Sequence, residues 1–135
     1  PTSGGVLDDV PVGLPALTRA TKLGKRASSV GFDWPDAAGV RTKVDEELAE
    51  LDAAVAAGNT TEVAAEIGDL LFSIANWCRH SGLDPETCLR AANQKFTTRF
   101  RVVERAVASS GRPWSEQDAA MLDAFWRRAK SADEI

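Results

Sequence analysis

The chain has 135 residues, of which 44% are hydrophobic and 27% charged, a size and balance typical of one soluble globular domain. Its net charge of −4 argues against a nucleic-acid partner, because phosphate backbones are bound by basic surfaces. No apolar run approaches the roughly 20 residues that a membrane span requires, so we expect no membrane association.

The composition changes after the first thirteen residues. Residues 1–13 are rich in Pro, Gly and Asp, which predicts a flexible tail or linker, and we expect an all-α domain over residues 14–135. The first residue is Pro1 instead of Met, which suggests a piece of a longer chain. Cys78 and Cys88 lack metal-site spacing, so we expect two reduced core thiols and a cytoplasmic protein.

Apolar residues at helical spacing, with capping residues and Gly or Pro stops between them, predict about five helices and no strand. The expected segments are Leu14–Ser29, Asp36–Ala57, one from a cap at Thr60 or Thr61 to His80, Pro85–Ser109 after a cap at Asp84, and one from a capping box at Ser115 and Asp118 through Lys130. The third has the widest apolar face, so we expect it to be the most buried.

Acidic residues gather in the second and third of these helices. The two runs read Glu46-Glu47-Leu48-Ala49-Glu50 and Glu66-Ile67-Gly68-Asp69, on either side of a turn at Gly58-Asn59. Residues three apart share one side of a helix, so an antiparallel hairpin would bring two carboxylate pairs together, where they repel unless a cation lies between them. Oxygen ligands favour Mg²⁺ or Mn²⁺ over zinc.

The five acids are not equivalent. Glu47 falls within the apolar stripe of its helix, Glu50 lies at the edge of that stripe, and Glu46 points away. Glu66 and Asp69 continue into Ser73 and Asn76 as a polar seam beside the apolar face of the third helix. A buried carboxylate is costly unless it is paired or coordinated, although a solvated acidic surface is the alternative interpretation of all five.

A di-iron site is a competing metal interpretation. It requires two Glu-x-x-His pairs, and this chain has a single histidine, His80. We therefore set the di-iron site aside and interpret His80 as a surface residue at a helix end.

Two cations follow on the fourth predicted helix. Lys95 and Arg99 are four residues apart beside its apolar stripe, and Asn93 interrupts that stripe. Such a pair suits a phosphate clamp, with solvent exposure as the alternative. Trp126 and Lys130 repeat the pattern in the fifth helix, where a core role is the alternative for Trp126.

These motifs resemble the all-α nucleoside triphosphate pyrophosphohydrolases, and specifically the C-terminal domain of the MazG family. The resemblance covers residues from about Leu14 to Lys130. It rests on the two acidic runs and on three further stretches: Lys22-Leu23-Gly24-Lys25-Arg26 with Val30-Gly31-Phe32-Asp33-Trp34, Asn76-Trp77-Cys78-Arg79-His80, and Asn93-Gln94-Lys95-Phe96-Thr97-Thr98-Arg99-Phe100.

The resemblance implies that a nucleoside triphosphate is hydrolysed to the monophosphate and pyrophosphate, with Mg²⁺ held by Glu47, Glu50, Glu66 and Asp69. It implies phosphate contacts for Lys95 and Arg99, a position near the nucleotide for Trp126 and Lys130, and a helical bundle completed by homodimerisation. We add Asn93 to the expected substrate contacts, and Glu46 or Glu50 as acceptor of the proton from the attacking water.

Three alternatives stay open at this point. Two of them are relatives specialised for one substrate, dUTP in the first case and phosphoribosyl-ATP in the second. The third is a helical dimerisation or regulatory module without catalysis.

Overall fold

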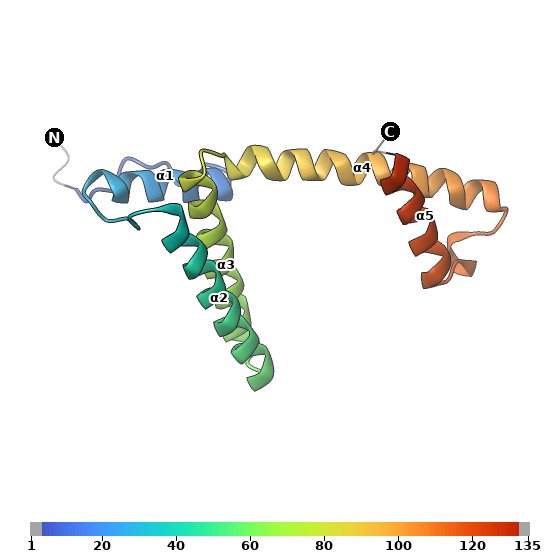
Figure 1. Ribbon diagram of the computed structural model, residues 1–135, viewed down its shortest axis with the longest axis horizontal. Helices are drawn as coiled ribbons and strands as arrows, with labels where there is room; N and C mark the ends of the chain where they lie inside the picture. Colours follow the sequence, from blue (N-terminus) through green and yellow to red (C-terminus); the bar gives the residue numbers. More distant parts are fainter. Residues whose placement is uncertain (1–3, 133–135) are drawn as a thin grey trace. The chain divides into compact units, whose positions relative to one another are not determined.

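The computed structural model describes residues 4–132 of the chain. In chain order its elements are α1 (Ala16–Ser29), α2 (Ala37–Ala57), α3 (Thr60–His80), α4 (Pro85–Ser110), the short 3₁₀ helix η1 (Trp114–Glu116) and α5 (Ala119–Ala132) (Figure 1). No strand occurs among the described residues, so the prediction of an all-α fold with five α-helices is confirmed.

The helix starts follow capping chemistry. The Asp36 side chain accepts a hydrogen bond from the Gly39 amide at the start of α2. At the start of α3 the acceptor is Asn59, which binds the Glu62 amide, so the prediction of a threonine cap was wrong by one residue. Gly58 separates the two helices in the left-handed conformation, at φ 70°, which glycine adopts without a steric penalty.

The start of the last helix also differs from the prediction. The expected capping box at Ser115 is instead part of η1, and α5 begins four residues later. The Asp118 side chain accepts a hydrogen bond from the Met121 amide at 2.8 Å and caps α5. Pro113 immediately before η1 explains the short 3₁₀ turn, because its fixed φ favours a fresh start over continuation of α4.

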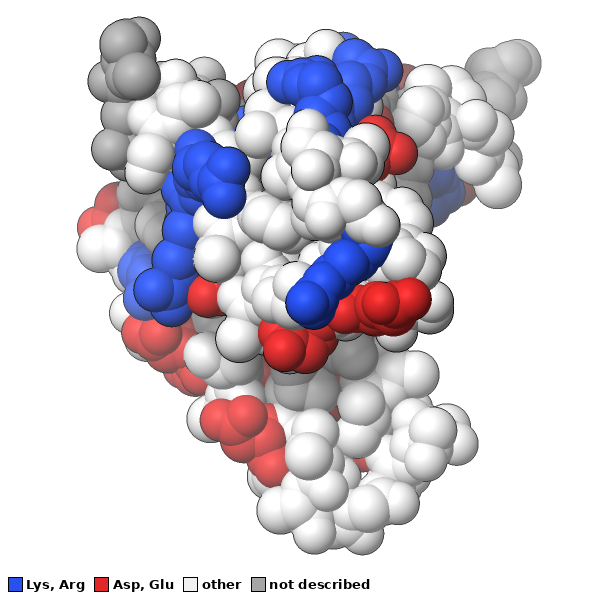
Figure 2. All heavy atoms as spheres, turned by 90° about the vertical axis from the view of Figure 1, so that its right-hand side faces the viewer, with Lys and Arg blue, Asp and Glu red and all other residues white. Residues whose placement is uncertain are grey.

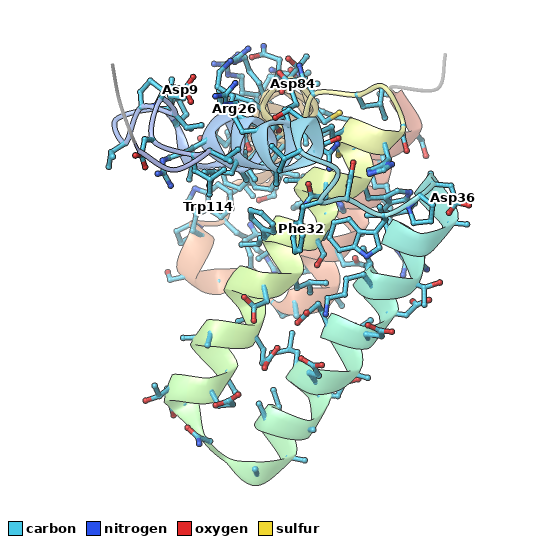
Figure 3. All side chains as sticks on the ribbon, turned by 90° about the vertical axis from the view of Figure 1, so that its left-hand side faces the viewer. Asp9, Arg26, Phe32, Asp36, Asp84 and Trp114 are labelled. Carbon is cyan, nitrogen blue, oxygen red and sulfur yellow. The ribbon has the colours of Figure 1, made fainter. Side chains whose placement is uncertain are left out.

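The chain forms two compact units, one up to Cys88 and one from Leu89 on. In the first unit α2 and α3 lie side by side as an antiparallel hairpin (Figures 1 and 3). Helix α1 packs on α3 where Gly24 is buried, and a Cβ atom at this position would lie 2.4 Å from Oδ1 of Asn76. Glycine is therefore required for the close approach of α1 to α3.

The residues before α1 contact that helix. Arg26 forms a 3.0 Å ion pair with Asp9 and donates to the carbonyl oxygen of Val6, and Arg19 donates to that of Pro11 (Figure 3). Val10 is buried. Part of the stretch expected as a tail is thus held against α1, and its role as a linker stays a prediction.

The second unit has a small apolar core of its own. Val103 and Val107 of α4 pack on Ala129 of α5. The partly buried residues around them are Val102, Leu122, Phe125 and Trp126. Side chains spaced three and four residues apart on two amphipathic helices produce this packing, as the sequence pattern predicts.

Burial in α3 differs from what the sequence predicts. The buried residues of α3 are Glu66, Ser73, Ala75 and Asn76, whereas Ile67, Leu71 and Ile74 are exposed. The expectation that α3 is the most buried helix through its apolar face was therefore wrong for this chain alone. Cys88 is also exposed, so the prediction of two core thiols fails for one of them.

The exposed aliphatic residues of the hairpin share one flank. At about 100° per residue, Leu48 and Val55 are rotated by about 80–100° from Glu47, and Ile67 and Ile74 by similar angles from Glu66. On antiparallel helices, equal rotations from the facing line point to the same side. Leu48, Val55, Ile67, Leu71 and Ile74 thus form one surface, the apolar flank, and all five are exposed.

No helix within residues 4–132 is long and apolar enough to cross a membrane. Figure 2 shows both basic and acidic side chains among uncharged ones on the face that it draws.

Candidate metal centre

Three carboxylates meet inside the hairpin. Glu47 of α2 and Glu66 and Asp69 of α3 each offer an oxygen, and these oxygens all lie within 4.8 Å of one another. Glu66 and Asp69 are three residues apart and share one side of α3, while the antiparallel turn at Gly58 brings Glu47 opposite them. Figure 3 shows side chains of the two helices pointing toward each other across the hairpin.

Glu50 lies near this group. Its carboxylate contributes to the raised pKa of Glu66 and to the lowered pKa of Glu47, although Glu50 is not one of the three acids whose oxygens lie within 4.8 Å of one another. Glu47 and Glu66 are buried, whereas Glu50 and Asp69 are exposed at the side of the hairpin opposite the apolar flank. The structure therefore brings three of the four predicted ligands together, and the role of all four as metal ligands stays a prediction.

Glu46 lies apart from the group. Its side chain is exposed and stands 3.8 Å from the Nζ atom of Lys43, one turn earlier in α2. It does not belong to the group of acids within 4.8 Å, which agrees with its predicted rotation away from the apolar stripe.

Charge in the group is unevenly compensated. Lys43 forms a 2.9 Å ion pair with Oε1 of Glu47, and this contact lowers the pKa of Glu47 below its usual range. Burial raises the pKa of Glu66 to about 7, and the neighbouring Glu47 and Glu50 carboxylates add to the rise. Lys43 therefore compensates the charge of Glu47, whereas no basic side chain among the described residues forms an ion pair with Glu66.

Two buried carboxylate oxygens favour a cation site at this group. Oε2 of Glu47 and Oε2 of Glu66 are buried and have no hydrogen-bond partner among the described residues. With a pKa of about 7, Glu66 is partly protonated near neutral pH, but when both side chains are ionised they only accept, so neither then satisfies the other. Buried oxygens without a donor are costly, and a divalent cation would satisfy both at once. The all-oxygen donor set fits Mg²⁺ or Mn²⁺.

The remaining predicted site residues belong to the second unit. Asn93 and Lys95 of α4 and Lys130 of α5 are exposed, and Arg99 is partly buried. The Trp126 ring is also partly buried and lies 5.5 Å from that of Phe96. Since the acids lie in the first unit, a single site formed by both sets stays a prediction.

An aromatic pocket in the second unit was not predicted. Phe100 stacks on Phe96 at 5.8 Å and on Trp114 at 5.7 Å between ring centroids. Together with Val103, Leu122, Asp123 and Trp126 these rings line a cavity of about 330 Å³. The i, i+4 spacing of Phe96 and Phe100 was visible in the sequence, but the contribution of Trp114 depends on the loop after α4.

A buried polar network was also missed. Arg79 of α3 binds both carboxylate oxygens of Asp33 at 2.9 Å, and His80 Nε2 lies 2.8 Å from Oδ1 of the same residue. The His80 side chain is only 13% exposed, so its interpretation as a surface residue was wrong. Asp33 comes from the loop between α1 and α2, and no local spacing connects it to Arg79.

The Asn76 amide extends this network. Its Oδ1 accepts hydrogen bonds from Arg79, and its Nδ2 donates to the carbonyl oxygen of Phe72. The network therefore fixes the loop before α2 and the end of α3, about two to four turns from Glu66 and Asp69.

Comparisons with known proteins identify relatives of the chain. Residues 25–96, which include both acidic runs, match the family described as phosphoribosyl-ATP pyrophosphohydrolase. The chain is 43% identical over 90% of its length to a Thermotoga maritima protein named nucleoside triphosphate pyrophosphohydrolase/pyrophosphatase MazG. It is 43% identical over 92% of its length to an Escherichia coli protein named nucleoside triphosphate pyrophosphohydrolase.

A third relative, the Bacillus subtilis protein named uncharacterized protein YabN, is 36% identical over 98% of the chain and 27% of its own length. The chain spans 46% of the Thermotoga relative and 48% of the Escherichia coli relative, about half of each. The resemblance predicted from the motifs is confirmed over most of this sequence: the chain belongs to the family of MazG-type nucleoside triphosphate pyrophosphohydrolases.

Proposed function

We propose that the chain hydrolyses nucleoside triphosphates between the α and β phosphorus atoms, to nucleoside monophosphate and pyrophosphate. The observation that carries the proposal is the pair of buried carboxylate oxygens, on Glu47 and Glu66, that have no donor among the described residues. The names of the Thermotoga and Escherichia coli relatives support the same reaction.

A divalent cation belongs to the proposal. Glu47, Glu50, Glu66 and Asp69 would hold Mg²⁺, with Mn²⁺ as a substitute, because hard cations prefer oxygen ligands. When bound, the cation supplies Lewis-acid stabilisation of the negative charge on the triphosphate.

The other steps fall to side chains of the chain itself. Glu46 or Glu50 accepts the proton of the attacking water, since both carboxylates are exposed and Glu50 is the nearer of the two to the buried acids. Lys95 and Arg99 receive the pyrophosphate, since cations four apart on a helix present two charges to one phosphate group. Asn93, Trp126 and Lys130 lie near the nucleoside in this proposal.

The biological role we propose is removal of non-canonical or damaged nucleotides from the pool, in the cytoplasm. A second candidate is favoured by the description of the matching family, which names phosphoribosyl-ATP as its substrate. A relative specialised for dUTP is the third substrate that we keep under test.

We also propose that the chain forms a homodimer through the apolar flank of the hairpin. Five exposed aliphatic side chains on one surface are unusual for a monomer, and a second copy of the same surface provides a self-complementary cover. The core of the bundle would then lie between two chains, in addition to the small core of the second unit.

The test mixes the protein with Mg²⁺ and a panel of standard, non-canonical and damaged triphosphates, dUTP and phosphoribosyl-ATP. Pyrophosphate release that disappears when EDTA removes the metal supports the proposal, and the preferred base separates the three substrate candidates. No pyrophosphate from any member of the panel would favour a dimerisation or regulatory module.

A further inference from the structure

Lys43 contacts the acidic group without being one of its acids. Its Nζ atom lies 2.9 Å from Oε1 of Glu47, four residues later on α2. The second oxygen of Glu47 is buried without a partner, in the group it forms with Glu66 and Asp69. The two oxygens of one carboxylate thus have different environments, one satisfied by Lys43 and one left for the acidic group.

From this division we infer that Lys43 is a positioning residue for the metal centre. By binding one oxygen of Glu47 it fixes the rotamer of that side chain and directs the other oxygen to the space shared with Glu66 and Asp69. The inference rests on the proposed metal centre. In metal sites generally, groups that orient the ligands raise affinity without touching the ion.

A neighbouring ion pair shows why the Lys43 contact is more than a surface salt bridge. Arg41 and Asp45 pair on the same helix with the same spacing, and their side chains are 48% and 64% exposed. The side chain of Glu47 is 7% exposed and that of Lys43 is 35% exposed. An exposed pair contributes little, whereas a buried carboxylate depends on its partner for its conformation.

The charge of Lys43 acts in the opposite direction, because an ammonium group repels a dication. Two features reduce this repulsion. Lys43 binds the oxygen of Glu47 opposite the unpaired one, and its partial exposure lets water and salt screen its charge. We therefore expect the orientation of Glu47 to outweigh the repulsion between Lys43 and the metal ion. Weaker metal binding after Lys43 is replaced would indicate orientation, and tighter binding would indicate repulsion.

The experiment measures Mn²⁺ affinity by the loss of the free-ion signal in electron paramagnetic resonance, with no nucleotide present. Lys43→Met removes the donor and the charge and keeps the side-chain length. We expect its dissociation constant for Mn²⁺ to rise by roughly 10- to 100-fold, the range found for groups that orient metal ligands. Lys43→Arg keeps a charged donor and should restore affinity to within a few-fold of the wild type.

Asp45→Asn is the matched control, since it removes the exposed pair on the same helix, keeps the contact of Arg41 with the Trp77 ring, and should leave Mn²⁺ affinity within a few-fold of the wild type. Circular dichroism checks that each variant is helical. If Lys43→Met does not fold, Lys43→Gln, which keeps a donor without the charge, takes its place, with a smaller loss expected.

Wild-type or tighter affinity in Lys43→Met, or in Lys43→Gln where it is used, would overturn the positioning role while leaving the metal centre intact. Absence of Mn²⁺ binding in the wild-type protein would overturn the metal centre itself, and the positioning role with it.

Discussion

The α2–α3 hairpin buries polar side chains as well as apolar ones, whereas the core of the α4–α5 unit is apolar. The hairpin encloses Glu47, Glu66 and Asn76 and exposes aliphatic residues on its flank, whereas the second unit encloses Val103 and Val107. A polar interior is stable only when its charges are compensated, and an apolar exterior only when it is covered.

The difference teaches which parts of the chain depend on other molecules. The second unit packs Val103, Val107 and Ala129 against one another without a buried charge, so we expect the stability of this small core to be independent of metal, although Phe96 and Trp114 stay exposed. The hairpin has uncompensated carboxylates inside and uncovered aliphatic groups outside. We therefore expect it to respond to both a cation and a second copy of the chain.

The largest expected effect is on assembly. Leu71→Glu places a charge in the middle of the apolar flank, which is tolerated in a monomer because this position is 51% exposed. In a dimer the charge would be buried without a partner, so we expect the dissociation constant to rise by about 1000-fold, equivalent to about 4 kcal/mol. Sedimentation equilibrium measures this change.

The matched control is Val12→Glu, at an exposed position before α1, which should leave the dimer intact. A wild-type protein that sediments as a monomer, or a Leu71→Glu variant that remains a dimer, would contradict the role of the flank.

The next effect is on turnover. Glu47→Gln removes one of the buried acids with little change in shape, and we expect pyrophosphate release to fall by roughly 100-fold or more. Circular dichroism should show the helical content unchanged. Glu62→Gln, an exposed change at the start of α3, serves as the control, and turnover near the wild-type value in Glu47→Gln would remove Glu47 from the site.

A smaller effect concerns pH-dependent stability. Hydrogen bonds from Arg79, and then from His80, hold the pKa of Asp33 well below its usual range. Asp33 therefore stabilises the folded chain above the pKa of the unfolded state, about 4, and this contribution is lost as the pH falls toward the folded pKa. Asp33→Asn should lower the free energy of unfolding by about 2–3 kcal/mol near neutral pH.

Denaturant titrations from pH 7 down to about pH 2 measure this difference. The gap in the free energy of unfolding between the wild type and Asp33→Asn should narrow below about pH 4. Asp52→Asn, on the exposed side of α2, should show almost no gap at any pH. A gap that stays constant with pH would show that the charge of Asp33 does not stabilise the fold.

The smallest effect tests the second unit. Val107→Ala removes two methyl groups from its core, where Val107 is 4% exposed, and should cost about 1–2 kcal/mol of stability. We expect the same loss with and without Mg²⁺, measured by denaturant titration. A loss that changes with metal would show that the two units do not differ in the way described above.

Much of the fold could be predicted because its signals are local. Asp36, Asp84 and the Gly58 turn mark helix ends through bonds within a few residues, and the predicted helix ranges lie close to the observed ones. The shift from Ser115 to Asp118 arose because two capping residues compete and Pro113 favours a short 3₁₀ turn at the first.

Burial was harder to predict because it depends on what faces each helix. The apolar face of α3 predicted a buried helix, but α2 packs against its polar seam instead. The acids were found from their spacing, and the i, i+4 spacing of Lys43 and Glu47 could have identified Lys43 too. Asp33 and Arg79 are 46 residues apart in the sequence, so no helical periodicity could have predicted their pairing.

The most direct test of the account is thermal unfolding of the wild type and Glu66→Gln, each in EDTA and in Mg²⁺ or Mn²⁺. We predict that metal raises the Tm of the wild type, because binding to the folded state alone stabilises it. Glu66→Gln should be at least as stable as the wild type in EDTA, because it removes a buried carboxylate without a donor, and should lose most of the metal response. A wild type that ignores metal, or a Glu66→Gln variant less stable in EDTA, would contradict the metal centre.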